Sequence, residues 1–258
     1  MAAGRSEGPR ALLWDVDGTL AETEQHGHLP AYNLAFAELG RPWRWDAAAY
    51  RRWLSVSGGR ERLTAFLEAM EGQPPEDALV EDLFAAKQRH YAAILSRGNL
   101  PLRPGVAALI AEAAAAGVPQ AVVTTSSRQA VTALVEGLSP SLAAAFRFWI
   151  CGEDVRAKKP DPEGYRQALQ RLGEEAPEGL LAIEDSPNGL AAASAAGLPC
   201  LVTPGAQSAG LPVATFAAAR AVVEALAAAD GAVRVQRGPA CPGGRVTLAY
   251  LGRLLEAP

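Results

Sequence analysis

Two pairs of carboxylates each follow a short apolar run of the sequence. Asp15 and Asp17 come directly after one such run, and Glu184 and Asp185 end another. An apolar run that gives way to polar residues is typical of a buried strand opening into a loop, where α/β enzymes place their chemistry. Carboxylate oxygens are ligands that suit Mg²⁺. Taken alone, the first pair also fits a surface turn containing Asp-x-Asp-Gly.

Hydroxyl groups and a lysine occur in two further segments. Thr124, Thr125 and Ser126 follow the apolar run 121–123, and Lys159 lies in a segment that its prolines keep out of a helix. Lysine and hydroxyl side chains bind anionic oxygens such as those of a phosphate. On charge pattern alone, the lysine segment also fits a solvated basic turn.

The order strand, polar residue, helix recurs along the chain. This order is typical of an α/β protein with a doubly wound, Rossmann-like parallel sheet, in which the carboxyl ends of the strands meet at one edge. We therefore expect the polar residues to lie together, and their chemistry favours a site for Mg²⁺ and a phosphate group. The residues expected at this edge are Asp15, Asp17, Thr124, Lys159, Glu184 and Asp185.

The interval between Asp17 and Thr124 is much longer than one strand and helix, which together take about 30 residues. It predicts an inserted α-helical cap domain that can close over the site and contact the rest of the substrate. The predicted cap helices span residues 31–39, 47–54, 60–70 and 76–95, and glycines at Gly40, Gly72 and Gly98 close three of them. The predicted domain limits are 24–97 for the cap, and 1–23 with 98–258 for the core.

A glycine pair inside the predicted cap opens a helix that carries two arginines. Gly58 and Gly59 precede Arg60 and Arg62. Backbone N–H groups at a helix start, with glycine allowing close approach, can bind a second anion. A plain loop followed by a charged helix face fits the same residues.

The four polar segments resemble, in order, the motifs of the haloacid dehalogenase superfamily of phosphotransferases. The matching motifs are Asp15-Val16-Asp17-Gly18-Thr19, Thr124, Lys159 and Glu184-Asp185, and the resemblance covers roughly residues 11 to 205. It implies that Asp15 is the nucleophile and forms an aspartyl-phosphate, while Asp17 is the acid and base. A halide leaves without a proton, so the presence of Asp17 argues for a phosphatase and against a dehalogenase.

The same resemblance implies a set of ligands for metal and phosphate. Mg²⁺ would be bound by the Asp15 side chain, the Asp17 backbone carbonyl and Asp185, with Glu184 beside the metal or as an alternative ligand. Lys159 would neutralise the transferring phosphoryl group and Asp15. The residues implied to hold oxygens of the substrate are Thr124, Thr125 and Ser126.

Within that superfamily the cap sequence is similar to the CbbY branch, which removes phosphate from xylulose-1,5-bisphosphate, an inhibitor of Rubisco. The residues carrying this similarity are Glu22-Thr23-Glu24, His28, Tyr50 and Gly58-Gly59-Arg60-Glu61-Arg62. It implies that Glu24, His28, Tyr50, Arg60 and Arg62 contact the sugar and its second phosphate. The branch usually has lysine at the position of Arg60, and a guanidinium and an ammonium are not interchangeable. Arg103, where the chain returns to the core, is expected either to add a phosphate contact or to brace the hinge.

Three other functions fit the core motifs. A mutase related to β-phosphoglucomutase would return the phosphoryl group to the sugar, and a phosphoglycolate-type phosphatase would act on a smaller ester. A phosphosugar-binding regulator would have little reason to retain Asp15, Asp17, Lys159 and Asp185 together. Phosphate release separates a phosphatase from a mutase, and Mg²⁺-dependent turnover separates both from a binding protein.

The composition limits the partners. A net charge of −4 and a pI near 5.5 give no basic surface for nucleic acid. No apolar run reaches transmembrane length without a charge, and the three scattered cysteines indicate no disulfide framework. We expect a monomer that binds a small phosphosugar, in the cytoplasm or, if a transit peptide has been removed, in the plastid stroma.

The C-terminal part lies beyond the resemblance. The alanine-rich stretch 214–229 predicts an amphipathic helix that covers the sheet. The alternating stretches 232–236 and 245–250 predict two strands of a long hairpin.

Overall fold

The computed structural model of the chain describes residues 8–97, 100–174 and 176–256. The outer ends of the predicted core, the predicted helix-closing Gly98 and the start of the predicted second core segment lie outside the described residues.

In the described part of the chain, seven strands form one sheet in the order β3-β2-β1-β4-β5-β6-β7. Strands β1 to β6 run parallel, and β7 pairs antiparallel with β6. The strands are β1 Ala11–Trp14, β2 Gln120–Val123, β3 Phe146–Ile150, β4 Leu180–Glu184, β5 Cys200–Val202, β6 Ala221–Val223 and β7 Val235–Arg237. The predicted α/β class with a doubly wound parallel sheet is confirmed.

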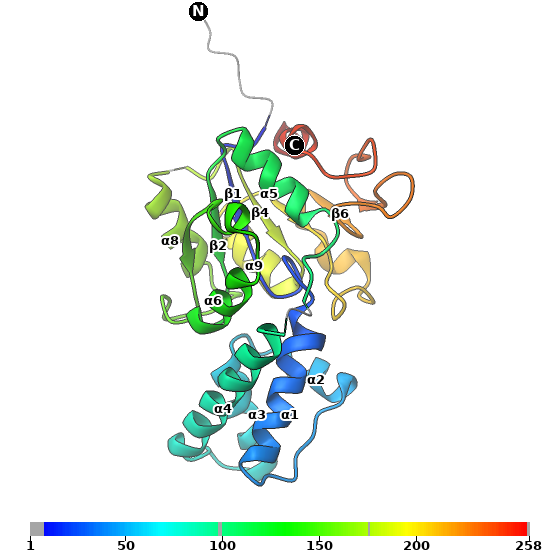
Figure 1. Cartoon of the computed structure of the whole chain (residues 1–258). Helices are drawn as coiled ribbons and strands as arrows, with labels where there is room; N and C mark the ends of the chain where they lie inside the picture. Colours follow the sequence, from blue (N-terminus) through cyan, green and yellow to red (C-terminus); the bar gives the residue numbers. More distant parts are fainter. Residues whose placement is uncertain (1–7, 98–99, 175, 257–258) are drawn as a thin grey trace, which may run out of the picture.

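Helices cover both faces of this sheet (Figure 1). Leu12 and Trp14 of β1 point into one hydrophobic core, and Leu13 points into another, because successive side chains of a strand alternate between faces. The first core is closed by α5 Val106–Ala115, α6 Arg128–Glu136 and α10 Leu248–Glu256, and the second by α8 Glu163–Leu172 and α9 Pro187–Ala195. The short α7 Pro140–Ala143 precedes β3.

A bundle of helices lies beyond the carboxyl ends of the strands, at the bottom of Figure 1. It contains a π-helical turn η1 Glu24–His28, followed by α1 Leu29–Glu38, α2 Ala47–Trp53, α3 Gly59–Glu71 and α4 Asp77–Leu95. The four helices predicted for this segment are therefore present. They enclose a separate core rich in aromatic rings, which include Tyr32, Phe36, Trp45, Tyr50 and Phe66. Below, this bundle is called the cap and the sheet with its covering helices the core.

The C-terminal predictions were partly wrong. The stretch 214–229 forms a single 3₁₀ turn, η2 Val213–Phe216, and then strand β6, because Val222 and Val223 find an open parallel edge at β5 and are fully buried there. The expected second hairpin strand forms helix α10 instead, whose buried Leu251 and Leu254 pack into the first core. Its sequence places apolar residues at helical as well as at alternating spacing.

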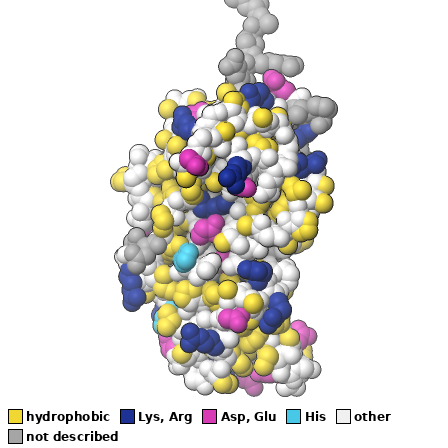
Figure 2. Space-filling view, turned by 90° about the vertical axis from the view of Figure 1, so that its right-hand side faces the viewer, with side chains coloured by type: hydrophobic (Ala, Val, Ile, Leu, Met, Phe, Trp, Pro, Cys, Tyr) yellow, Lys and Arg dark blue, Asp and Glu magenta, His cyan; other side chains and the backbone are white. Residues whose placement is uncertain are grey.

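The length of the helices and the distribution of surface charge are two general features of the described residues. None of the helices in the described residues is long and apolar enough to cross a membrane. On the face drawn in Figure 2, acidic and basic side chains are interspersed over both the core and the cap.

Candidate active site

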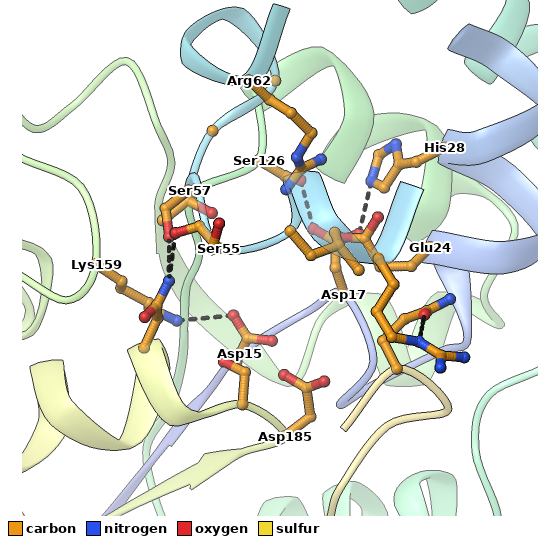
Figure 3. A pocket seen from close by; sticks show the side chains of 18 of the residues that line it. Asp15, Asp17, Glu24, His28, Ser55, Ser57, Arg62, Ser126, Lys159 and Asp185 are labelled. Carbon is orange, nitrogen blue, oxygen red and sulfur yellow. Dashed lines mark hydrogen bonds and ion pairs between the residues drawn. The ribbon is translucent and has the colours of Figure 1, made fainter. Parts of the chain in front are cut away.

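A cavity of about 430 Å³ lies between the strand ends of the core and the cap. Side chains from both regions line it, and Figure 3 shows them converging from the sheet edge on one side and from the cap helices on the other. The lining includes eleven residues named from the sequence: Asp15, Asp17, Glu24, His28, Gly58, Gly59, Arg62, Thr125, Ser126, Lys159 and Asp185.

Lys159 lies at the centre of the end of the cavity that the core forms, called the core end below. Its ammonium donates to Asp15 Oδ1 and Glu184 Oε1, both at 2.7 Å, and to the carbonyl of Val123 at 2.8 Å. Burial alone would lower the pKa of Lys159, but the two carboxylates outweigh burial and raise it. Burial raises the pKa of Asp15, against the opposing effect of Lys159. Lys159 therefore places a cation beside the Asp15 side chain, and both residues line the cavity.

Three buried carboxylates could hold a metal at this end. Asp15, Glu184 and Asp185 each offer an oxygen, and the three atoms lie within 4.8 Å of one another. Burial and the neighbouring Asp15 and Glu184 raise the pKa of Asp185 well above its ordinary value. Glu184 Oε2 is buried without a hydrogen-bond partner in the structure. Crowded, under-compensated oxygen ligands fit a divalent cation such as Mg²⁺.

The loop after β1 makes room for these carboxylates with glycine. A Cβ on Gly18 would lie 2.3 Å from Asp185 Oδ2, and the φ of Gly18 is +86°. Any side chain there would push Asp185 from the site and strain the backbone. The Asp-x-Asp-Gly sequence is thus a requirement of the site rather than an ordinary surface turn.

The Asp17 side chain turns from the metal ligands towards the cap (Figure 3). It accepts hydrogen bonds from Thr23 at 2.5 Å, from His28 Nε2 at 2.9 Å and from Ser126. Burial alone would raise the pKa of Asp17, but His28 and these hydrogen bonds lower it below its ordinary range. Of the predicted metal ligands, Asp17 is the one whose carboxylate does not join the cluster, and the use of its backbone carbonyl as a ligand stays a prediction.

The three hydroxyl residues after β2 have different positions. Thr125 and Ser126 line the cavity, whereas Thr124 is buried behind it, and its Oγ1 accepts from the N–H of Ser126 at 3.1 Å. Ser126 links this loop to Asp17. Thr124 therefore fixes the loop that carries Ser126, and its contact with a phosphate stays a prediction.

At the cap end, Arg62 is buried and lines the cavity. Its guanidinium donates to the Tyr50 hydroxyl and to the Trp53 carbonyl, both at 3.1 Å. Tyr50 in turn donates to Glu24. Tyr50 does not line the cavity, so its part is to hold Arg62 and Glu24 in place rather than to touch a ligand.

Arg60 and Arg103, both predicted substrate contacts, are placed outside the cavity lining. Arg60 forms an ion pair with Glu81 and lies over the ring of Phe84. Residues two positions apart on a helix face different ways, so Arg60 and Arg62 cannot both point at one ligand. Arg103 donates to the carbonyls of Gly18, Thr203 and Pro204 and pairs with Glu22 at 3.0 Å. The brace expected as the alternative is the role that these contacts support.

Sequence reasoning missed Lys87 of α4, a buried lysine in the cavity lining. Its ammonium lies 5.2 Å and 4.9 Å from the ring centres of Tyr32 and Tyr91 and donates to Gln88 at 2.9 Å. Within the described residues no carboxylate lies within ion-pair distance of it. The signal was present: Leu83, Lys87 and Tyr91 share the buried face of a predicted helix, and a lysine in an apolar stripe needs an anionic partner.

Comparisons with known proteins agree with this geometry. Residues 9–197 match the family model of haloacid dehalogenase-like hydrolases. The chain is 48% identical to protein CbbY of Cupriavidus necator over 204 residues, which are 76% of this chain and 78% of that protein. Among solved structures, a mutant CbbY from Rhodobacter sphaeroides in complex with xylulose-1,5-bisphosphate superposes with a TM-score of 0.77 at 41% identity, over 84% of this chain and 94% of that one.

The same protein in complex with phosphate also superposes with a TM-score of 0.77, at 42% identity and with the same coverage of both chains. These identities extend over the core and the cap, and the family match spans most of the chain. The chain is therefore a phosphatase of the haloacid dehalogenase-like hydrolase family and belongs to its CbbY branch.

Proposed function

We propose that this phosphatase requires Mg²⁺, acts through an aspartyl-phosphate on Asp15 and hydrolyses a sugar bisphosphate, most specifically xylulose-1,5-bisphosphate. One observation carries the proposal: the cavity has cations at both ends, with Lys159 at the strand edge and Arg62 and Lys87 at the cap. A substrate with a phosphate at each end matches this arrangement. The solved relative in complex with xylulose-1,5-bisphosphate supports the identity of the sugar.

The first step is the attack of an Asp15 oxygen on the phosphorus at the core end. An Asp15 O–P bond forms, the P–O bond to the sugar breaks, and the departing sugar oxygen takes a proton from Asp17. Asp17 must gain this proton from solvent before the step, because His28, Ser126 and Thr23 favour its carboxylate form in the free protein. Lys159, 2.7 Å from Asp15, reduces the repulsion between the carboxylate and the phosphate.

The second step hydrolyses the aspartyl-phosphate. Asp17, now a carboxylate, takes a proton from a water molecule, whose oxygen attacks phosphorus and releases phosphate with regeneration of Asp15. The structure suits this half of the cycle, because Thr23, His28 and Ser126 all hydrogen-bond to the Asp17 carboxylate. Their fixed positions keep its orientation constant between the two steps.

Asp15 and Asp185 would hold Mg²⁺ with the Asp17 carbonyl, and Glu184 would lie beside it or act as a ligand. When bound, Mg²⁺ supplies positive charge against the crowded carboxylates and the phosphate. Glu184 Oε1 is already engaged by Lys159 and by Tyr165 at 2.5 Å, so its primary effect in the protein is to orient Lys159.

The test is phosphate release in the presence of Mg²⁺ from xylulose-1,5-bisphosphate, compared with ribulose-1,5-bisphosphate, glucose phosphates and phosphoglycolate. We expect the highest kcat/KM on the xylulose compound. Equal rates on all esters would contradict the proposed substrate, and conversion of glucose phosphates without phosphate release would indicate a mutase.

A further inference from the structure

An ion pair joins the cap to the core beside the catalytic lysine. The ammonium of Lys158 donates to both carboxylate oxygens of Glu61, at 2.6 Å and 2.7 Å. Lys158 directly precedes Lys159 in the core loop, and Glu61 lies in the first turn of cap helix α3. A charge-assisted hydrogen bond of this kind is shorter and stronger than one between neutral groups. We call it the cap latch.

Two glycines make the space in which the latch lies. A Cβ on Gly58 would be 2.1 Å from Glu61 Oε2 and 2.8 Å from Lys158 Nζ, and the φ of Gly58 is +91°. On the core side, a Cβ on Gly152 would be 3.2 Å from Lys158 Cε and 2.5 Å from the Thr125 carbonyl. The glycine pair that suggested an anion site thus has another role at its first position: Gly58 lets a core lysine reach the helix start.

A second contact to the same cap segment comes from the start of helix α9, which follows strand β4. Asn188 Nδ2 donates to the Ser55 carbonyl and to Ser57 Oγ, both at 3.2 Å. Asn188 lies in the first turn of α9, three residues after the metal-ligand candidate Asp185. Residues 55–61 are therefore held by the loop that carries Lys159, through Glu61, and by the loop that carries Asp185, through Ser55 and Ser57. None of these contacts requires a substrate.

We propose that the Glu61–Lys158 cap latch closes the cap on the core and, in doing so, makes Glu61 and Lys158 positioning residues for Lys159. The latch fixes the residue next to Lys159, whose ammonium must face Asp15 and Glu184 at 2.7 Å. This inference rests on the proposed role of Lys159, but not on the identity of the sugar. It predicts that the latch matters for every phosphate ester, whether or not the ester reaches Arg62 and Lys87.

The chain offers a matched control on the next residue. Arg60 pairs with Glu81, so that ion pair lies wholly within the cap, whereas Glu61–Lys158 spans the boundary. We would compare Glu61→Gln with Arg60→Gln by steady-state kinetics on para-nitrophenyl phosphate and on xylulose-1,5-bisphosphate. Glu61→Gln should lower kcat roughly two- to fivefold on both esters, the range of an exposed ion pair, while Arg60→Gln leaves kcat unchanged.

Charge reversal separates positioning from general loss of structure. Glu61→Lys alone should reduce kcat more than Glu61→Gln, because two lysines then repel, and adding Lys158→Glu should restore most of the loss. Amide hydrogen exchange of residues 152–159 should rise in Glu61→Lys and return to the wild-type level in the double variant. Restored exchange without restored kcat would overturn the positioning role.

Two further results would also reject the latch. One is an equal effect of Glu61→Gln and Arg60→Gln, and the other is an effect of Glu61→Gln on KM for the bisphosphate alone, which would make Glu61 a substrate contact. The proposed substrate is tested separately. If it is wrong, the wild-type enzyme will show no preference for xylulose-1,5-bisphosphate over para-nitrophenyl phosphate, while the latch variants will still have a lower kcat.

Discussion

The core end and the cap end of the cavity are built on different scaffolds. At the core end, Asp15 and Asp185 follow the neighbouring strands β1 and β4. The pairing of these two strands fixes their ends side by side. At the cap end, Arg62 and Lys87 project from separate helices whose relative position depends on the aromatic core between them. A short motif can therefore identify the first end, whereas the second end depends on how helices pack.

The two ends also differ in how charge is compensated. Lys159 is enclosed by two carboxylates, and the acidic cluster around it has an excess of negative charge. Among the described residues, the direct contacts of the Lys87 ammonium are two aromatic faces and an amide, and the carboxylates of Asp17 and Glu24 act on it from beyond ion-pair distance. The core end is thus suited to a cation and the transferring phosphoryl group, and the cap end to an anion that is bound but not changed. Four experiments can break or sharpen this division.

The largest effect is expected at the nucleophile. Asp15→Asn should lower kcat by at least about 10³-fold, because an amide cannot attack phosphorus. The side chain keeps its size, so the thermal unfolding temperature should stay within a few degrees of the wild type. Phosphate release from xylulose-1,5-bisphosphate with calorimetry on the same sample measures both. Substantial residual turnover in a folded variant would remove Asp15 from the role of nucleophile.

Removal of divalent cations should nearly abolish turnover, because the three carboxylates at the core end would then repel the phosphate. Dialysis against a chelator followed by titration with Mg²⁺ tests this. Asp185→Asn should raise the Mg²⁺ concentration needed for half-maximal activity by roughly tenfold or more, with binding of Mg²⁺ followed independently by calorimetry. Full activity in the chelated enzyme would show that the cluster serves another purpose.

The sequence predicted the core end better than the rest, for a physical reason. Parallel strands deliver their last residues to one edge, so Asp15, Lys159 and Asp185 could be placed together without knowing any distance. The cap helices were predictable from periodicity and closing glycines, but the side of each helix that faces the cavity was not. The sequence alone does not distinguish Arg60 from Arg62, because both are arginines in the same helix. Only the packing of α3 on α4 decides which of them enters the cavity.

The C-terminal part shows the opposite limit. Val222 and Val223 became a strand because the edge of β5 was free, and α10 became a helix because α5 offered an apolar surface. Both outcomes depend on partners far away in the sequence. A local pattern that fits either period cannot decide between them.

The arginine pair gives the sharpest test of the cap end. Arg62→Lys should raise KM for xylulose-1,5-bisphosphate roughly tenfold to a hundredfold. The guanidinium of Arg62 bonds Tyr50 and also faces the cavity, and a lysine ammonium cannot do both. KM for para-nitrophenyl phosphate should change little. Arg60→Lys is the matched control and should leave both KM values within about twofold. If Arg60→Lys has the larger effect, the assignment of the two arginines is reversed.

The smallest expected effect concerns the charge of Lys87. Burial lowers its pKa to about 8, with Asp17 and Glu24 raising it and Arg62 lowering it further. Since a lysine is charged only below its pKa, KM for the bisphosphate should rise by up to about tenfold between about pH 7 and about pH 9 as the ammonium is lost. KM for para-nitrophenyl phosphate should not follow this curve, which corrects for changes at the core end. In Lys87→Gln the bisphosphate should bind weakly across the whole range, and a pH dependence that survives this substitution would have to come from another group.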